Sequence, residues 1–381
     1  MVPMYIRPEY VEKFRCDGTM CGSCCCRDWK VAVDPETYGR YCALQPESLR
    51  DEICGWISGQ DDKGNHHVRL REDGRCPFLG EDGLCRLQKE YGEDYLSDIC
   101  YSYPRVSYRV GDIVEQSLAM SCPVAAGLLL GGEGPLRFVG GRMEEGRPGW
   151  LLDMSGKVGR YEEDWQELQS AGIWLLQDRR FSLDWRLFSL LCFFERAESH
   201  LTEGREEAFR RLLEEVQSGE FSVQTAACGV GFQREEYIRI MMGAFHALYG
   251  APANEERRRA LASIHAAHYP VFAESLLHGR RHLFENYLAN EFFLRLYPYA
   301  CSASLGENAR LFVLSWKVTE FALLMLSAQE TMDFERILLG IGRMTERLDH
   351  NRSGMQAIRG CLGDFFRGGT AEEFAGKLLS L

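Results

Sequence analysis

The chain has 381 residues, of which 45% are hydrophobic and 26% charged, and its formal net charge is −12 at pH 7. This length favours two domains, and the composition is typical of a soluble globular protein. Neither half of the chain is basic. Nucleic acid is therefore not expected as a partner, because phosphate binding needs a concentrated basic face.

The first residues lack the basic and then apolar pattern of a signal peptide, so we expect the protein in the cytoplasm. No segment predicts a membrane span. The most apolar long stretch, residues 311–328, contains Lys317 and Glu320 and is typical of a buried amphipathic helix. A reducing compartment and an odd number of cysteines, fifteen, argue against a disulfide framework.

Residues 1–130 are rich in Cys, Gly and Asp. Their pattern predicts short elements, with strands at 29–33, 67–71 and 107–120 and helices at 35–45, 46–58 and 85–91. The last of these strand regions is expected to be a hairpin that turns at Gly111-Asp112. The pair His66-His67 lies in a polar stretch and is expected on the surface.

A glycine-rich segment, residues 131–157, predicts a linker. From 158 to 381 the apolar residues recur with a helical period, which is enough for roughly eight to ten helices. The sequence therefore predicts a mainly α protein. A small Cys-rich, mixed α/β metal-binding N-terminal region is expected to pack on an all-helical C-terminal domain.

Eleven of the fifteen cysteines precede residue 123. Nine of these fall in four elements: Cys16, Cys21, Cys24, Cys25, Cys26, Cys76, Cys85, Cys100 and Cys122. Thiolates so close together repel one another unless a cation or cluster neutralises them, so we predict a soft metal bound by ligands from this set. Pro123 suits the first position of a helix, which makes Cys122 its N-cap and lowers the pKa of that thiol.

The other six cysteines are predicted to be inert, buried side chains: Cys42, Cys54, Cys192, Cys228, Cys301 and Cys361. Structural zinc typically uses paired Cys-x2-Cys units, and only Cys21–Cys24 has this form, so the spread single cysteines favour an iron–sulfur cluster over zinc. The spacing from Cys16 to Cys24 is one residue longer than that of radical S-adenosylmethionine enzymes. No alternating strand–helix pattern for their barrel follows.

Several stretches together resemble the flagellin lysine-N-methylase family: the cluster 16–26 with Trp29, Cys76-Pro-Phe-Leu through Cys85, Cys100 with Tyr103-Pro104-Arg105, and Ser117 through Ala126. Downstream, Glu285-Asn-Tyr-Leu-Ala-Asn-Glu291, with Phe292, Leu296 and Pro298, is similar to the C-terminal signature of that family. The N-terminal part also has a looser likeness to small CxxCxxCC proteins that chelate iron or zinc.

The resemblance implies an enzyme that transfers a methyl group from S-adenosylmethionine to lysine side chains, with a 4Fe-4S cluster. Flagellin is the implied substrate, and another lysine-bearing protein is the alternative. The cluster ligands would come from the nine cysteines named above. Cys26, a third consecutive thiol, departs from the simplest pattern and leaves the choice of four ligands open. Zinc stays the alternative metal.

Methyl transfer needs a neutral lysine amine, whereas the ordinary lysine pKa is about 10.4. No glycine-rich loop of a Rossmann-type methyltransferase is evident, which gives a cluster the task of holding the methyl donor. Asn286 and Asn290 share a helical face beside Glu291, where they could bind the donor or a lysine, or bridge neighbouring helices. Arg105 could bind a carboxylate through two hydrogen bonds or form a structural salt bridge.

Two interpretations without methyl transfer remain open from the sequence. One is a zinc- or iron-stabilised scaffold whose helical domain binds another protein. The other is an electron-transfer or redox-sensing iron–sulfur protein. Binding of S-adenosylmethionine by anaerobically purified protein distinguishes the methyltransferase from both.

Overall fold

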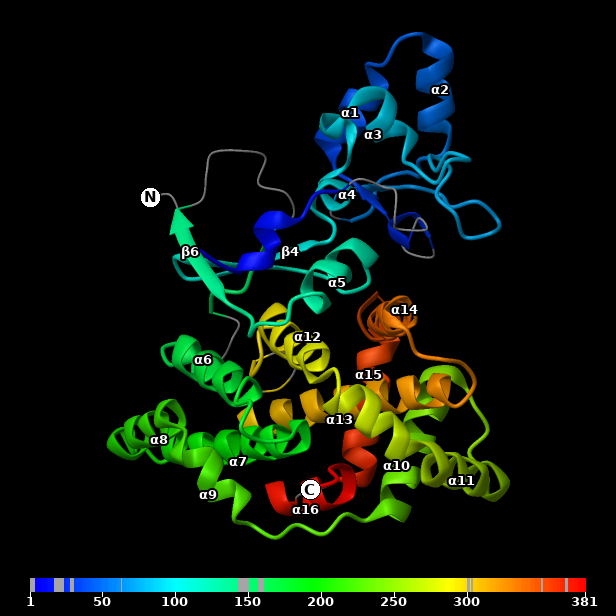
Figure 1. The fold of residues 1–381 in the computed structure, drawn as a ribbon. Helices are drawn as coiled ribbons and strands as arrows, with labels where there is room; N and C mark the ends of the chain where they lie inside the picture. The colour runs from blue at the N-terminus through cyan, green and yellow to red at the C-terminus, as the bar shows by residue number, and fades with distance from the viewer. Residues whose placement is uncertain are drawn as a thin grey trace. The chain divides into compact units, whose positions relative to one another are not determined.

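The computed structural model describes residues 4–16, 24–27, 31–62, 64–142, 151–156, 161–299, 302, 304–350, 352–366 and 369–381. The chain forms two compact units (Figure 1). The first comprises Met1–Ala126 and Val139–Asp153, and the second comprises Gly127–Phe138 and Met154–Leu381. One boundary falls within helix α5 (Pro123–Leu130).

The first unit contains a five-stranded sheet with the strand order β6-β1-β5-β4-β7. Its strands are β1 (Met4–Pro8), β4 (Arg105–Val110), β5 (Ile113–Leu118), β6 (Phe138–Arg142) and β7 (Leu151–Asp153). β4 and β5 form the predicted antiparallel hairpin, with Val110 opposite Ile113. Gly111 in its turn has φ +58°, a conformation that glycine adopts without strain. β1 and β7 add in parallel to β5 and β4.

Short helices and a two-stranded ribbon are the other regular elements in the described part of this unit, besides the start of α5. They are η1 (Glu9–Lys13), η2 (Cys24–Cys26), α1 (Pro35–Cys42), α2 (Glu47–Gly55), α3 (Arg86–Tyr91), η3 (Glu93–Tyr95) and α4 (Asp98–Ser102), with β2 (Ala32–Val33) paired to β3 (His66–His67). The three predicted short helices are therefore present. His66 was expected on the surface but is only 7% exposed, because its ring stacks on that of Tyr38.

Asp34 connects two of these helices. Its carboxylate accepts a hydrogen bond from the N–H of Thr37 at 2.8 Å, which caps α1, and another from the N–H of Asp98 at 3.0 Å, at the start of α4. Burial by itself would raise the pKa of Asp34, but these two N–H groups lower it below its usual value. The ionised carboxylate is thus the form that stabilises the fold.

We expect Asp34→Ala to weaken the first turn of α1 by about 1–2 kcal/mol, the usual cost of losing an N-cap. Amide hydrogen exchange in α1 and α4 should speed up together, since both helices lose a partner. Because the pKa of Asp34 is lowered on folding, its contribution is present above its ordinary pKa of about 4 and is lost as the pH falls further. Faster exchange confined to α1 would contradict the link between the two helices.

The second unit is helical in most of its described residues (Figure 1). Its helices are α6 (Trp165–Leu176), α7 (Leu183–Thr202), α8 (Glu206–Ser218), α9 (Glu220–Ala226), α10 (Arg234–Tyr249), α11 (Glu255–Phe272), η4 (Ala273–His278), α12 (Arg281–Leu294), α13 (Leu305–Ser327), α14 (Phe334–Thr345), η5 (Glu346–His350), α15 (Arg352–Phe365) and α16 (Ala371–Leu378). The mainly helical prediction is confirmed.

The segment 131–157, expected to be a linker, contains β6 and β7, which belong to the sheet of the first unit. Residues 143–150 of this segment lie outside the described part. The helix expected at 311–328 corresponds to α13, which packs against α7, α11, α14 and α15. Among the described residues, none of the helices combines the length and apolar character needed to cross a membrane.

α13 carries a buried ion cluster. The Lys317 ammonium lies 2.7 Å from a carboxylate oxygen of Glu320 and 3.2 Å from one of Asp184, on α7. Lys317 and Glu320 are each 1% exposed. The other carboxylate oxygen of Asp184 accepts a hydrogen bond from the N–H of Ser380, which fixes the C-terminal segment. Three further titratable side chains face the cluster from α10 and α11: Tyr237, His265 and Tyr269.

Glu320 should make the stability of the second unit pH-dependent. Burial raises the pKa of Glu320 from 4.5 to about 7, although Lys317 opposes this shift. The folded protein therefore keeps a proton that the unfolded chain loses, so this contribution is full below pH 4.5 and is lost as the pH rises through 7.

We expect the unfolding free energy of Glu320→Gln, relative to that of the parent, to rise with pH between about pH 4.5 and 7, because the variant lacks the loss that Glu320 causes there. Burial lowers the pKa of His265 to about 4, which gives an opposite trend in both proteins. The difference between the two curves therefore isolates Glu320. Urea titrations at several pH values measure it, and parallel curves would show that Glu320 does not titrate in this range.

Candidate metal and cofactor site

Two thiols on the short helix η2 lie beside a third from a distant loop. The Sγ atoms of Cys25 and Cys26 are 3.8 Å apart, and the Cys26 thiol also hydrogen-bonds the Cys76 thiol. The backbone is paired at the same place: the N–H of Cys76 donates to the carbonyl oxygen of Cys26 at 2.7 Å, next to the bridge between Arg27 and Arg75. This pairing brings together cysteines that are far apart in the sequence.

The Cys26 thiol affects the charge of its two neighbours. Its hydrogen bonds are the strongest influence on Cys25 and Cys76 and lower the pKa of both, and the Arg71 guanidinium lowers that of Cys76 further. The same hydrogen bonds, together with burial, raise the pKa of Cys26 far above its ordinary value. Because the thiolate is the form that binds a metal, Cys25 and Cys76 are the best prepared ligands.

Three more thiols lie within electrostatic range of Cys25, namely Cys85, Cys100 and Cys122. Cys85 is the N-cap residue of α3, and Cys122 directly precedes Pro123, the first residue of α5, as predicted. Burial raises the pKa of Cys100 to about 12 and that of Cys122 to about 11. The first N–H groups of α5 lower the pKa of Cys122, but burial outweighs them, so the predicted net lowering is wrong.

Six of the nine predicted ligands therefore gather in one region: Cys25, Cys26, Cys76, Cys85, Cys100 and Cys122. Cys16 is exposed, and its charge acts on Cys122. Cys21 and the side chain of Cys24 lie outside the described residues. In the part of the chain that is described, no three His, Cys, Asp or Glu side chains are grouped closely enough to hold a metal ion. The thiol donors fit a soft metal or iron–sulfur cluster by their chemistry, whereas the described side chains do not form a finished coordination shell.

Arg105 of β4 belongs to the same unit. Its guanidinium carbon lies 5.0 Å from the centre of the Phe14 ring. Burial lowers the pKa of Arg105, while Tyr101, Glu93 and Cys16 raise it through their charges. No carboxylate within the described ranges forms an ion pair with this guanidinium. Of its two predicted roles, the structural salt bridge is thus not formed there, and carboxylate binding remains a prediction.

The signature Glu285–Glu291 lies on α12 and is buried throughout. The side-chain amide of Asn286 donates to the backbone oxygen of Gly132 at 2.8 Å and to that of Leu129 at 3.4 Å. Glu291 accepts from Arg295 at 2.8 Å, and Asn290 is fully buried. Asn286 therefore bridges elements, one of the two roles that the sequence left open. Binding of a donor or lysine by these residues stays a prediction.

Within this signature, Glu285 accepts hydrogen bonds from two arginines, a role that the sequence did not predict. The carboxylate is 0% exposed and receives hydrogen bonds from Arg179 at 2.9 Å and from Arg186 at 2.7 Å. Arg186 stands between Trp185 and Leu187 in an apolar stretch of α7. A charged residue in such a stretch needs a buried partner of opposite charge. The position of Arg186 in the sequence could therefore have indicated a buried carboxylate.

A family model described as the FliB lysine N-methylase C-terminal domain matches residues 169–366, more than half of the chain. The chain belongs to this family. The match begins in α6 and ends just after α15, so it contains the signature on α12 and both of its arginine partners. The likeness expected from the sequence is thereby confirmed at the level of the lysine N-methylase family.

Individual relatives support this membership. The lysine-N-methylase of Salmonella typhimurium is 32% identical over 126 residues, which make up 32% of this chain and 31% of that protein. The flagellar biosynthetic protein FliU of Salmonella muenchen is 34% identical over 132 residues, which cover 32% of this chain and 75% of that protein. The matched part thus spans about a third of the Salmonella typhimurium lysine-N-methylase. No solved structure matches the chain.

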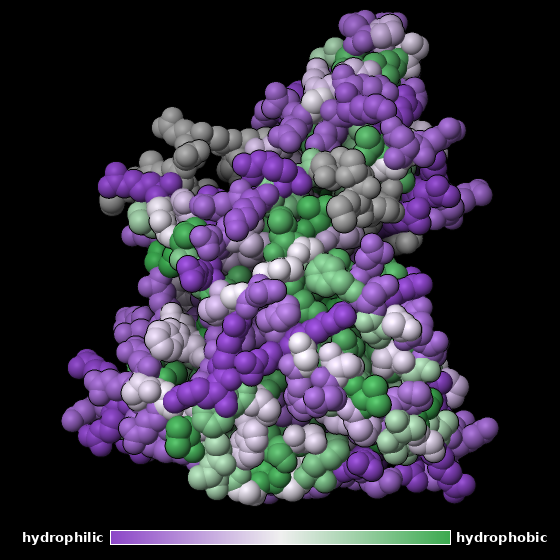
Figure 2. Space-filling model, in the orientation of Figure 1, coloured by the Kyte–Doolittle hydropathy of each residue, from purple (hydrophilic) through white to green (hydrophobic). Residues whose placement is uncertain are grey.

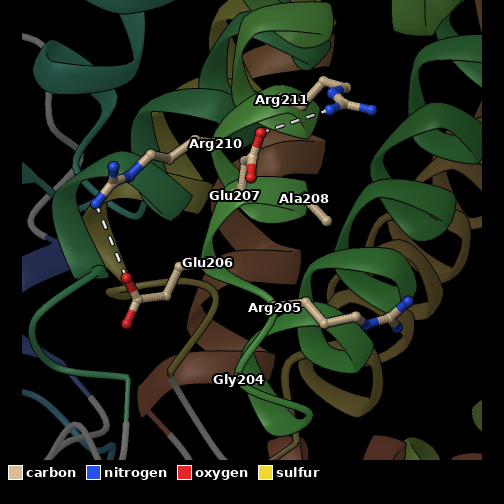
Figure 3. A pocket seen from close by; sticks show the side chains of 7 residues that line it. All are labelled: Gly204, Arg205, Glu206, Glu207, Ala208, Arg210 and Arg211. Carbon is tan, nitrogen blue, oxygen red and sulfur yellow. Dashed lines mark ion pairs between the residues drawn. The ribbon is translucent and has the colours of Figure 1, made fainter.

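A hollow on α8 does not provide an alternative site. It is lined by residues 204–208, 210 and 211, all from a single stretch of chain (Figure 3). Two ion pairs within the helix, Glu206–Arg210 at 3.9 Å and Glu207–Arg211 at 3.8 Å, neutralise its charges. The helix lies in a strongly hydrophilic part of the visible surface, at the lower left of Figure 2. An open, self-neutralised depression lacks the enclosed apolar lining of a small-molecule site.

Proposed function

We propose that this protein is a protein-lysine N-methyltransferase that uses S-adenosylmethionine and a 4Fe-4S cluster, with flagellin as its substrate. Membership of the lysine N-methylase family supports the reaction class. The name of the relative FliU, a flagellar biosynthetic protein, supports a flagellar substrate.

The gathering of thiols from separate segments is the observation that carries the cofactor part of this proposal. The cluster ligands would be drawn from the nine predicted cysteines. Among those that the structure describes, Cys25 and Cys76 come first because their pKa values are lowered. A bound cluster with one open iron site would supply a position for the amino and carboxylate groups of the methyl donor.

Arg105 is the residue of this unit that we assign to the donor carboxylate. Its half-buried guanidinium can offer two parallel N–H groups, a geometry that matches a carboxylate. In the second unit, the amide oxygen of Asn286 has no hydrogen-bond partner among the described residues although the side chain is 2% exposed. Such an acceptor suits the ammonium or amine of a lysine substrate.

Co-expression of a candidate flagellin with and without this protein tests the activity. The expected result is a mass increase of flagellin in steps of one methyl group, on lysine residues alone. An unmodified flagellin, together with no binding of S-adenosylmethionine by the anaerobically purified protein, would leave the metal-binding scaffold as the better interpretation.

The variant Arg105→Lys keeps the charge but removes the planar pair of donors. It should bind S-adenosylmethionine about tenfold more weakly while keeping its metal content, because Arg105 is not a predicted ligand. If the variant lost metal to the same extent as it lost S-adenosylmethionine binding, Arg105 would instead support the fold around the thiols. Isothermal titration and metal analysis measure the two effects separately.

A further inference from the structure

We propose that Cys42 and Cys54 form a redox-active dithiol, which closes a disulfide between α1 and α2 when the protein meets a small-molecule disulfide such as oxidised glutathione. The sequence predicted both residues to be inert and buried. In the structure their Sγ atoms are 3.9 Å apart, Cys42 is exposed and Cys54 is partly exposed. By contrast, Cys192 on α7, which received the same prediction, is only 5% exposed.

The geometry allows a bond to form with small movements. A disulfide has an S–S length of about 2.05 Å, so the two sulfur atoms must approach by roughly 2 Å. Cys42 is the last residue of α1 and Cys54 lies in the last turn of α2. Side chains at helix ends can change rotamer with little crowding, and rotation about Cα–Cβ moves a sulfur atom by this amount.

This pair is not among the predicted metal ligands, although Cys54 packs on the same hydrophobic core as Cys76. The charges that act on Cys54 come from Cys42, Arg50 and Asp51. Those that act on the clustered thiols come mainly from one another. The dithiol can therefore change its oxidation state without using a proposed metal ligand.

The surroundings assign different roles to the two thiols. Burial and the neighbouring Cys42 raise the pKa of Cys54 to about 11, so Cys54 is a poor first nucleophile at neutral pH. Cys42 is more exposed, and the Tyr38 hydroxyl hydrogen-bonds its sulfur. An exposed sulfur is accessible to a dissolved disulfide. Cys42 is therefore the attacking thiol and Cys54 the resolving thiol.

The exchange balances without a further reactant. The Cys42 thiolate attacks one sulfur of oxidised glutathione, the S–S bond of glutathione breaks, and one glutathione thiolate leaves. The Cys54 thiolate then attacks the Cys42 sulfur of the mixed disulfide and releases the second glutathione. The two thiol protons of the protein end on the two released glutathione molecules, and the protein gains one disulfide.

Peptide mapping of the full chain tests the proposal. Trypsin should cut after Arg40, Arg50 and Lys63, so that Cys42 and Cys54 fall in the separate peptides 41–50 and 51–63. The protein is kept anaerobic, titrated with oxidised glutathione, alkylated and digested. We expect the disulfide-linked pair of these peptides to accumulate several-fold above any other linked pair, with unchanged metal content. Separately alkylated peptides, or a bond from either residue to a clustered cysteine, would overturn the proposal.

Single variants test the order of attack. Cys54→Ser should hold one glutathione on Cys42, because the resolving thiol is absent, whereas Cys42→Ser should leave Cys54 mostly alkylated. Cys228→Ser, a partly exposed cysteine just after α9, is the matched control and should still give the linked peptides. Failure of Cys54→Ser to hold glutathione would overturn the assignment of Cys42 as the attacking thiol.

Discussion

Replacing Glu285 by alanine is expected to destabilise the second unit by about 3–5 kcal/mol, the cost of removing one partner from a buried ion pair. Arg186, which is 2% exposed, would keep its charge, and its hydrogen-bond partners among the described residues would be the backbone oxygens of Leu176 and Phe181. Arg179 would lose its contact with the same carboxylate. Urea unfolding followed by far-ultraviolet circular dichroism should show a lower midpoint.

Two further variants serve as controls for Glu285→Ala. Glu285→Gln keeps the shape of the side chain but not its charge, so we expect a smaller loss than for alanine, because hydrogen bonds to at least one arginine persist. Glu207→Ala removes an ion pair on α8 whose glutamate side chain is 94% exposed, and it should leave the midpoint unchanged. Equal midpoints for Glu285→Ala and the parent would show that the second unit does not depend on this contact.

The elements that the sequence predicted well are those whose signals are local. The turn at Gly111 needs a positive φ and joins two β-rich runs, and Pro123 begins α5 at the position where its missing N–H has no cost. The long helices of the second unit follow from periodicity over many residues. None of these features depends on which distant segment packs against them.

Pairing between distant segments was not predictable in the same way. β6 and β7 come from a glycine-rich stretch that reads as a linker, yet β7 is paired in parallel with β4 and belongs to the same sheet. Short strands of this kind are stabilised by their neighbours and not by their own propensity. A single sequence does not indicate which distant strands pair with β6 and β7.

In the candidate site, too, local features were predictable and contacts between distant segments were not. Residue type and crowding pointed to the N-terminal cysteines as metal ligands, and six of them lie near one another. Which thiols touch depends on the backbone pairing of Cys26 with Cys76, which spacing alone does not reveal. For Cys42 and Cys54 the sequence had no signal, because their proximity arises from the packing of α1 on α2.

Cys76→Ser is expected to remove most of the bound iron from anaerobically purified protein, by roughly tenfold or more, since even outer-shell changes cost ten- to a hundredfold in metal affinity. Cys76 is 6% exposed, hydrogen-bonds Cys26 and has a lowered pKa, which favours its thiolate as a ligand. A serine hydroxyl in its place supplies no thiolate. Iron and sulfide analysis with visible absorption measure the loss, and flagellin methylation should fall with it.

The control for this prediction is Cys192→Ser, which changes a buried thiol on α7 in the second unit. It should keep the iron and the methylation of the parent, because Cys192 is not a predicted ligand. Circular dichroism of Cys76→Ser should retain the helical signal, since most helices belong to the second unit. Two results would contradict the proposed cluster: full iron content in Cys76→Ser, or a colourless parent that contains zinc. Methylation that persists after the iron is lost would instead separate the reaction from the cluster, and the thiols would then have a structural role.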